Sequence, residues 1–168
     1  MIGALDLAPL TRFHTFDVSI PFPGGHAAKD SLQNVCKTLR TIPSSDSNFH
    51  TLYLSTYVGL YSYDKPEHIL TADWAELDME IFRISTSDHN HKQQQKFTLY
   101  LDIVYDGPDS DDSNSDGEGE DTLIEQCESV FRTLAKEKLP QSYSAEDVII
   151  RTRYSLQGWV GWTTLEPI

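Results

Sequence analysis

Apolar and polar residues alternate along five stretches of this chain, with the period of two that is typical of a β-strand. The clearest stretch is Phe97–Tyr105, in which Leu99 and Leu101 share one face and Tyr100 lies on the other. Both faces carry large side chains, so we expect this strand inside a sheet and not at its edge. The predicted strands are Phe13–Ile20, Phe49–Tyr63, Trp74–Ile84, Phe97–Tyr105 and Val148–Leu156.

Two further stretches have the period of a helix. An apolar stripe with a spacing of three and four residues predicts a helix over Ala27–Ile42. A second helix is predicted to begin at Thr122, because Thr122 and Glu125 have the spacing of a capping box. Pro140 is expected to end it, since proline cannot continue a helix.

The resulting element order is β-α-β-β-β-α-β, which is the ferredoxin-like order with one strand added. Two helices that each have a single apolar stripe can cover only one face of a five-stranded sheet. We therefore predict an α+β fold. It would be a two-layer sandwich with a mostly antiparallel five-stranded sheet, two helices on one face and the other face open. The length of 168 residues fits one domain over residues 1–168.

The negative charge is concentrated in one part of the chain. The formal net charge is −13, and Asp106–Glu128 holds ten acidic residues with no Lys or Arg, so the remainder carries only −3. This distribution predicts a flexible acidic loop at residues 106–121 and argues against binding to nucleic acid or to an anionic membrane, which need a basic surface. The loop residues expected to contact a basic partner segment are Asp109, Asp111, Asp112, Asp116, Glu118 and Glu120.

The two cysteines favour an intracellular location. Cys36 and Cys127 both fall on the apolar faces of predicted helices, where two buried thiols in a reducing compartment are favoured over a disulfide between them. The first residues lack the pattern of a signal peptide, and no stretch has the length and apolarity of a membrane span. We predict a cytoplasmic or nuclear protein.

Motifs that would indicate catalysis or metal binding are incomplete. Asp112–Gly117 matches the first half of a calcium loop, but Leu123 stands where the bidentate glutamate belongs. His89 and His91 would supply only two ligands on a loop. No nucleophile or metalloprotease motif is present. We therefore assign no catalytic residue, no metal and no cofactor, and favour a non-catalytic protein.

The predicted open face of the sheet is rich in aromatic and basic side chains. Tyr, Trp and Arg are the residue types in which binding energy is concentrated at interfaces. A solvated sheet face, with aromatic rings that shield the backbone, is the simpler interpretation. The predicted partner-binding residues are Tyr53, Tyr57, Tyr61, Trp74, Tyr100, Arg151, Arg153, Trp159 and Trp162.

Three functional hypotheses follow. The first is a protein-interaction subunit, adaptor or dedicated chaperone, with the open face as the main interface and the acidic loop as a second, electrostatic contact. The second is a small-ligand binder or enzyme, in which the sheet curls around a pocket. That pocket would be lined by Tyr53, Tyr57, Trp74, Glu76 and Tyr100. The third is an acidic loop that imitates nucleic acid in a basic partner.

Overall fold

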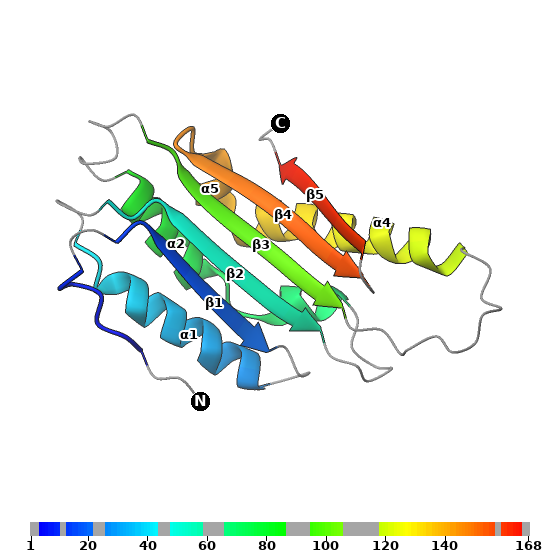
Figure 1. Cartoon of the computed structure of the whole chain (residues 1–168), viewed down its shortest axis with the longest axis horizontal. Coiled ribbons are helices and arrows are strands. Elements are labelled where there is room, and N and C mark those ends of the chain that lie inside the picture. The colour runs from blue at the N-terminus through cyan, green and yellow to red at the C-terminus, as the bar shows by residue number, and fades with distance from the viewer. Residues whose placement is uncertain are drawn as a thin grey trace.

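The computed structural model describes residues 4–10, 13–21, 26–43, 48–58, 66–86, 95–105, 118–156 and 159–165. Strands alternate with helices along most of the chain (Figure 1). The elements are β1 (Thr15–Pro21), α1 (His26–Arg40), β2 (Thr51–Val58), the 3-10 helix η1 (Pro66–Thr71), α2 (Ala75–Ser85), β3 (Phe97–Tyr105), α4 (Glu118–Thr133), the π-helical turn η2 (Leu134–Lys138), α5 (Pro140–Ser144), β4 (Val148–Leu156) and β5 (Trp159–Leu165).

One five-stranded sheet forms the centre of the fold, with its strands in the order β1-β2-β3-β4-β5. The first four strands run parallel to one another. The last strand, β5, pairs antiparallel with β4, which precedes it in the chain. The predicted central position of Phe97–Tyr105 is confirmed, because β3 lies between β2 and β4. The register places Asp17, Tyr53, Tyr100 and Arg151 side by side across the four parallel strands.

The prediction of a mostly antiparallel α+β sheet is wrong, because the segment predicted as a strand over Trp74–Ile84 forms helix α2. Its buried side chains include Leu77, Ile81 and Ile84, which follow the helical period. A strand over Trp74–Ile84 would place Met79 on the same face as Leu77, but Met79 is 51% exposed. A helix between β2 and β3 allows those strands to be parallel, so the fold is α/β.

The described helices form one layer on one face of the sheet. Connections between parallel strands are right-handed, so a strand order that never reverses places every crossover on the same face. Figure 1 shows α2, α4 and α5 behind the sheet. The first helix joins this layer, because Arg40 of α1 donates to Glu80 of α2 at 2.9 Å and Arg83 donates to the Leu39 carbonyl at 2.9 Å.

The core lies between this helical layer and the sheet. Apolar side chains of the strands point into it and are at most 2% exposed; they include Ile20, Leu52, Leu54, Phe97, Leu99, Leu101 and Ile150. Helical residues such as Leu32, Leu39, Leu77, Ile81, Val130 and Phe131 cover them. The assignment of the leucines and of Tyr53 and Tyr100 to opposite faces is confirmed, since both tyrosines are only partly buried.

Three features of the C-terminal part of the fold differ from the prediction. The second long helix begins at Glu118, four residues before Thr122. Pro140 does not simply end a helix: it occupies the first turn of α5, where its missing N–H costs no hydrogen bond. The tail after β4, for which no element was predicted, contains β5 and extends the sheet at that edge.

Candidate functional site

The face of the sheet opposite the helices is the main candidate surface. Parallel sheets are normally covered on both faces. Among the described residues, no helix lies on this second face, and its side chains are exposed or partly buried with few exceptions. We call it the open face. Because the strand order never reverses, the sheet also lacks the crevice at which doubly wound folds bind their ligands.

One row of the open face is aromatic at its centre and charged at both ends. The rings of Tyr53 and Tyr100 stack with centroids 4.2 Å apart and planes 12° from parallel. The Cζ atom of Arg151 lies over the Tyr100 ring, 5.7 Å from the ring centroid, and Nη1 of Arg151 donates to the Tyr100 hydroxyl at 3.2 Å. Asp17 is exposed at the other end of the row. Burial raises the pKa of Tyr53, and the neighbouring Tyr100 and Asp17 raise it further.

The next row contains a buried carboxylate that is only half satisfied. Arg153 donates from Nε to Asp102 Oδ2 at 2.9 Å, and its Nη2 contacts the same oxygen. Asp102 is 6% exposed, and among the described residues nothing donates a hydrogen bond to its Oδ1. A buried acceptor without a donor costs about 1–3 kcal/mol and is rare in native proteins. The open face therefore contains, at Asp102, a buried acceptor whose hydrogen-bonding capacity is unused.

A depression of about 210 Å³ lies over these two rows. Ser55 is small and lies in register between Ser19 and Asp102. The larger side chains around it form the walls. The lining residues are Asp17, Tyr53, Ser55, Tyr100, Leu101, Asp102 and Arg153.

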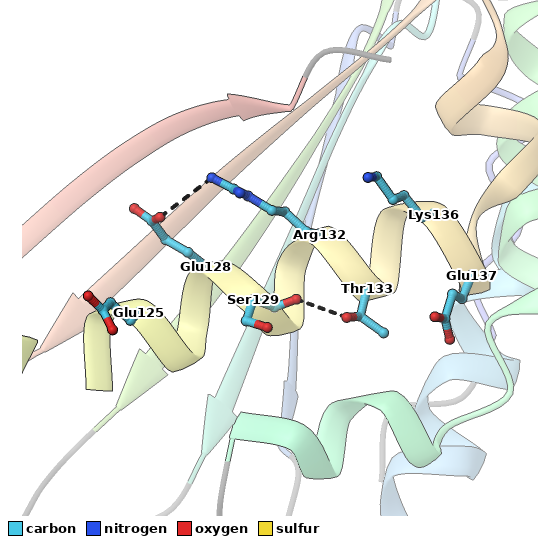
Figure 2. A pocket seen from close by; sticks show the side chains of 7 residues that line it. All are labelled: Glu125, Glu128, Ser129, Arg132, Thr133, Lys136 and Glu137. Carbon is cyan, nitrogen blue, oxygen red and sulfur yellow. Dashed lines mark hydrogen bonds and ion pairs between the residues drawn. The ribbon is translucent and has the colours of Figure 1, made fainter. Parts of the chain in front are cut away.

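A second hollow, of about 410 Å³, lies along α4 and η2 (Figure 2). Its polar side chains carry mixed charge, and Glu128 and Arg132 point toward each other with a 3.8 Å ion pair. Thr133 donates to the Ser129 carbonyl one turn earlier. Most of the lining side chains are exposed, so water can satisfy their polar groups, and the hollow has the character of an ordinary helix surface.

Four of the predicted site residues lie together on the open face: Tyr53, Tyr100, Arg151 and Arg153. Trp74 does not. It directly precedes α2, is 1% exposed, and donates from Nε1 to the Ile69 carbonyl at 2.7 Å. The prediction that placed Trp74 on this face is wrong because it assumed a strand. Glu76 lies on α2 and forms an ion pair with Arg40, so the pocket predicted from Trp74, Glu76 and the tyrosines is not formed.

Other predicted residues lie outside what the structure describes. Tyr61 and the acidic residues Asp109, Asp111, Asp112 and Asp116 fall in undescribed segments. A further group belongs to described strands or to α4, but their side chains are not described: Tyr57, Glu118, Glu120, Trp159 and Trp162. Their roles stay predictions.

Sequence reasoning missed Asp17, Ser55 and Asp102 as site residues. Alternation alone placed Asp102 on the correct face, and an acid at the centre of an otherwise apolar strand was a usable signal. The free oxygen itself could not be foreseen, because it depends on how Arg153 approaches from the neighbouring strand.

Comparisons with protein-family models, with curated proteins and with solved structures give no match. Among the described residues, no helix is both long and apolar enough to span a membrane. In the same part of the chain, no three His, Cys, Asp or Glu side chains gather into a possible metal site. The functional argument therefore depends on the geometry of the open face.

Proposed function

We propose that this chain is a non-catalytic interaction subunit or adaptor that binds a partner protein through the open face of its sheet. The observation that supports this most directly is a five-stranded sheet with four parallel strands, whose helices, in the part of the chain that the structure describes, all lie on one face. Parallel sheets that have one face in water are uncommon, and a bound protein would supply the second cover.

The composition and rigidity of the face support the same function. Tyr100 is held between the Tyr53 ring and the Arg151 guanidinium, so both aromatic side chains are positioned before a partner arrives. Side chains that are already ordered lose little conformational entropy on binding. Tyrosine and arginine are also the types that most often dominate interface energetics.

The charge of the chain favours a basic partner over a second copy. Two copies, each with a formal net charge of −13, would repel each other, whereas a partner with a basic segment would be attracted. Attraction of this kind speeds association more than it tightens the complex. We place the second, electrostatic contact in the acidic residues between 106 and 121.

The described nucleophile candidates do not favour catalysis. Cys36 and Cys127 are free but buried, and burial raises the pKa of Cys36 to about 12 and that of Cys127 to about 11. Thiols with such pKa values remain protonated near neutral pH and are poor nucleophiles. Buried free thiols also agree with a reducing, intracellular compartment, which is part of the proposal.

Site-specific photo-cross-linking tests the proposal. A benzoylphenylalanine would replace Ser19 or Thr98 on the open face, and, as the control, the exposed Met79 on α2. In cells that naturally make the chain, we expect covalent adducts with one protein from the open-face positions and not from Met79. Adducts formed equally from both surfaces, or with a second copy of the chain, would contradict the proposal.

The cross-linked protein would then be identified by mass spectrometry, purified and titrated against the chain. We expect Tyr100→Ala to weaken binding at least about tenfold, because it removes the centre of the aromatic row. Met79→Ala is the matched control and should leave the affinity unchanged. Equal affinities for the wild type and Tyr100→Ala would show that the partner binds elsewhere.

A further inference from the structure

We propose that the depression beside Asp102 binds a primary ammonium group, supplied by a lysine side chain of the partner protein. The assignment of the ammonium to a partner rests on the proposed function, whereas the ammonium site itself rests on the open-face residues alone.

The unsatisfied oxygen of Asp102 is the first reason. The carboxylate is 6% exposed, its Oδ2 is occupied by Arg153, and its Oδ1 has no donor among the described residues. Asp102 also lines the depression. A group that enters the depression and donates to Oδ1 would relieve the cost of the buried, unpaired acceptor. The occupant must therefore be a hydrogen-bond donor.

The charge of the lining selects a cationic donor. Two carboxylates, Asp17 and Asp102, face one guanidinium, Arg153, so the charged groups of the lining sum to −1. This balance favours a positive ligand over a phosphate or a carboxylate; Arg151, which contacts Tyr100, is outside the lining. The interaction is stronger here than at an open surface, because Asp102 is shielded from water.

The geometry at Asp102 favours an ammonium over a guanidinium. Arginine binds a carboxylate best through two parallel hydrogen bonds, one to each oxygen. Arg153 already contacts Oδ2 with two of its nitrogens, so only one oxygen remains. An ammonium is a compact charge with three rotatable donors and can share them among separate oxygens. Asp17, Ser55 and Asp102 provide such oxygens around the depression.

The size and walls fit a single long side chain. A volume of about 210 Å³ is below the ~300–1,000 Å³ of pockets that hold drug-sized ligands. The stacked rings of Tyr53 and Tyr100 form an apolar wall. The methylene groups of lysine can pack along such a wall while the ammonium reaches the oxygens.

NMR titration of the 15N-labelled full chain tests this with N-α-acetyl-L-lysine N-methylamide as the probe. We expect saturable shifts of the amides of Asp17, Ser55 and Asp102. The N-ε-acetylated analogue has no charge and should cause none. The arginine counterpart should bind more weakly. Equal shifts with the neutral analogue, or tighter binding of the arginine counterpart, would overturn the assignment.

A variant of Asp102 separates this site from general electrostatic attraction. In Asp102→Asn the side-chain oxygen should stay on Arg153, and the NH₂ group would then face the depression and oppose an ammonium. We expect at least about tenfold weaker binding of the probe, which corresponds to 1.4 kcal/mol. Asp73→Asn removes the same charge from an exposed position outside the sheet and should not change the affinity. Unchanged affinity in Asp102→Asn would overturn the proposal.

Two further measurements keep the test decisive. If thermal unfolding shows that Asp102→Asn is not folded, Ser55→Leu fills the depression without changing its charge and should abolish binding. Titration with 1,4-diaminobutane distinguishes a protein lysine from a small free amine, and tighter binding of the diamine would overturn the partner assignment. Cross-linking at Ser19 with no lysine-probe binding would contradict this site but leave the proposed function intact. Binding of the lysine probe without cross-linking at Ser19 would leave an ammonium site without a protein partner.

Discussion

Asp78 of α2 accepts the backbone N–H of Ser142 at 2.8 Å, although the two residues are 64 positions apart in the chain. The other carboxylate oxygen of Asp78 accepts the N–H of Gln141 at 3.0 Å. Both N–H groups lie in the first turn of α5, where no intrahelical carbonyl can reach them. A carboxylate from a different helix therefore caps α5 and holds it against α2.

Removal of this cap should destabilise the fold. Asp78 is almost completely buried, so Asp78→Ala would leave the N–H groups of Gln141 and Ser142 without an acceptor. We expect a loss of about 1–3 kcal/mol in the free energy of unfolding, measured by urea denaturation. Asp73→Ala, at an exposed position, should change it by less than about 0.5 kcal/mol. Equal effects of the two substitutions would contradict the capping role.

The same segment shows why the sheet could not be predicted from the sequence. Over a few residues, Leu77 and Ile81 fit both a period of two and the helical period. Met79, which the period of two places inside, is exposed, whereas Asp78 and Glu80, which it places outside, are buried. The local composition, rich in Ala, Glu, Leu and Met, favours a helix and was the usable signal. The relative direction of β2 and β3 depends on whether a strand or a helix connects them. One wrongly predicted element therefore changed the predicted fold class.

The open face was predictable because alternation within a strand does not depend on strand direction. The bounds predicted for Phe97–Tyr105 and Val148–Leu156 are those of β3 and β4, so Tyr100 and Arg151 were placed on the correct face. Which residues meet across strands could not be predicted, because that needs the register. The Tyr53–Tyr100 stack and the Asp102–Arg153 pair both depend on it.

The core beneath β3 gives a second prediction. Leu99 lies in the central strand and is completely buried, so Leu99→Ala would remove apolar contacts and leave a cavity. We expect the free energy of unfolding to fall by about 2–5 kcal/mol in chemical denaturation. Leu10→Ala is the matched control, because Leu10 is 53% exposed and its truncation should cost less than about 0.5 kcal/mol. A cost for Leu99→Ala as small as that for Leu10→Ala would contradict the assigned core.

The two cysteines should react only after unfolding. Burial raises the pKa of Cys36 to about 12 and that of Cys127 to about 11, and it also blocks access to both sulfur atoms. We expect iodoacetamide at about pH 8 to leave the native chain unmodified and to add two labels in denaturant, as measured by intact-mass spectrometry. Rapid labelling of the native chain would show that one thiol is accessible.

His50 should make the fold less stable in mild acid. Its pKa is lowered from 6.5 by burial and by the nearby His14, whose ring centroid lies 5.6 Å away. Below about pH 6.5 the unfolded chain therefore binds a proton that the folded chain does not, so stability falls as the pH decreases until His50 is also protonated in the folded state. His50→Gln should lose less stability than the wild type between about pH 7.5 and 5.5.

The pair on the open face should respond unequally to removal of either partner. Loss of Arg153 leaves the charge of Asp102 buried without its ion pair, whereas loss of the Asp102 charge leaves no buried charge behind, because the Arg153 side chain is 37% exposed. We therefore expect Arg153→Met to lower the free energy of unfolding by about 1–3 kcal/mol, and Asp102→Asn to lower it less. Urea denaturation of both variants checks the order. A larger loss for Asp102→Asn would show that Arg153, and not Asp102, depends on the pair, and that the buried carboxylate is satisfied in another way.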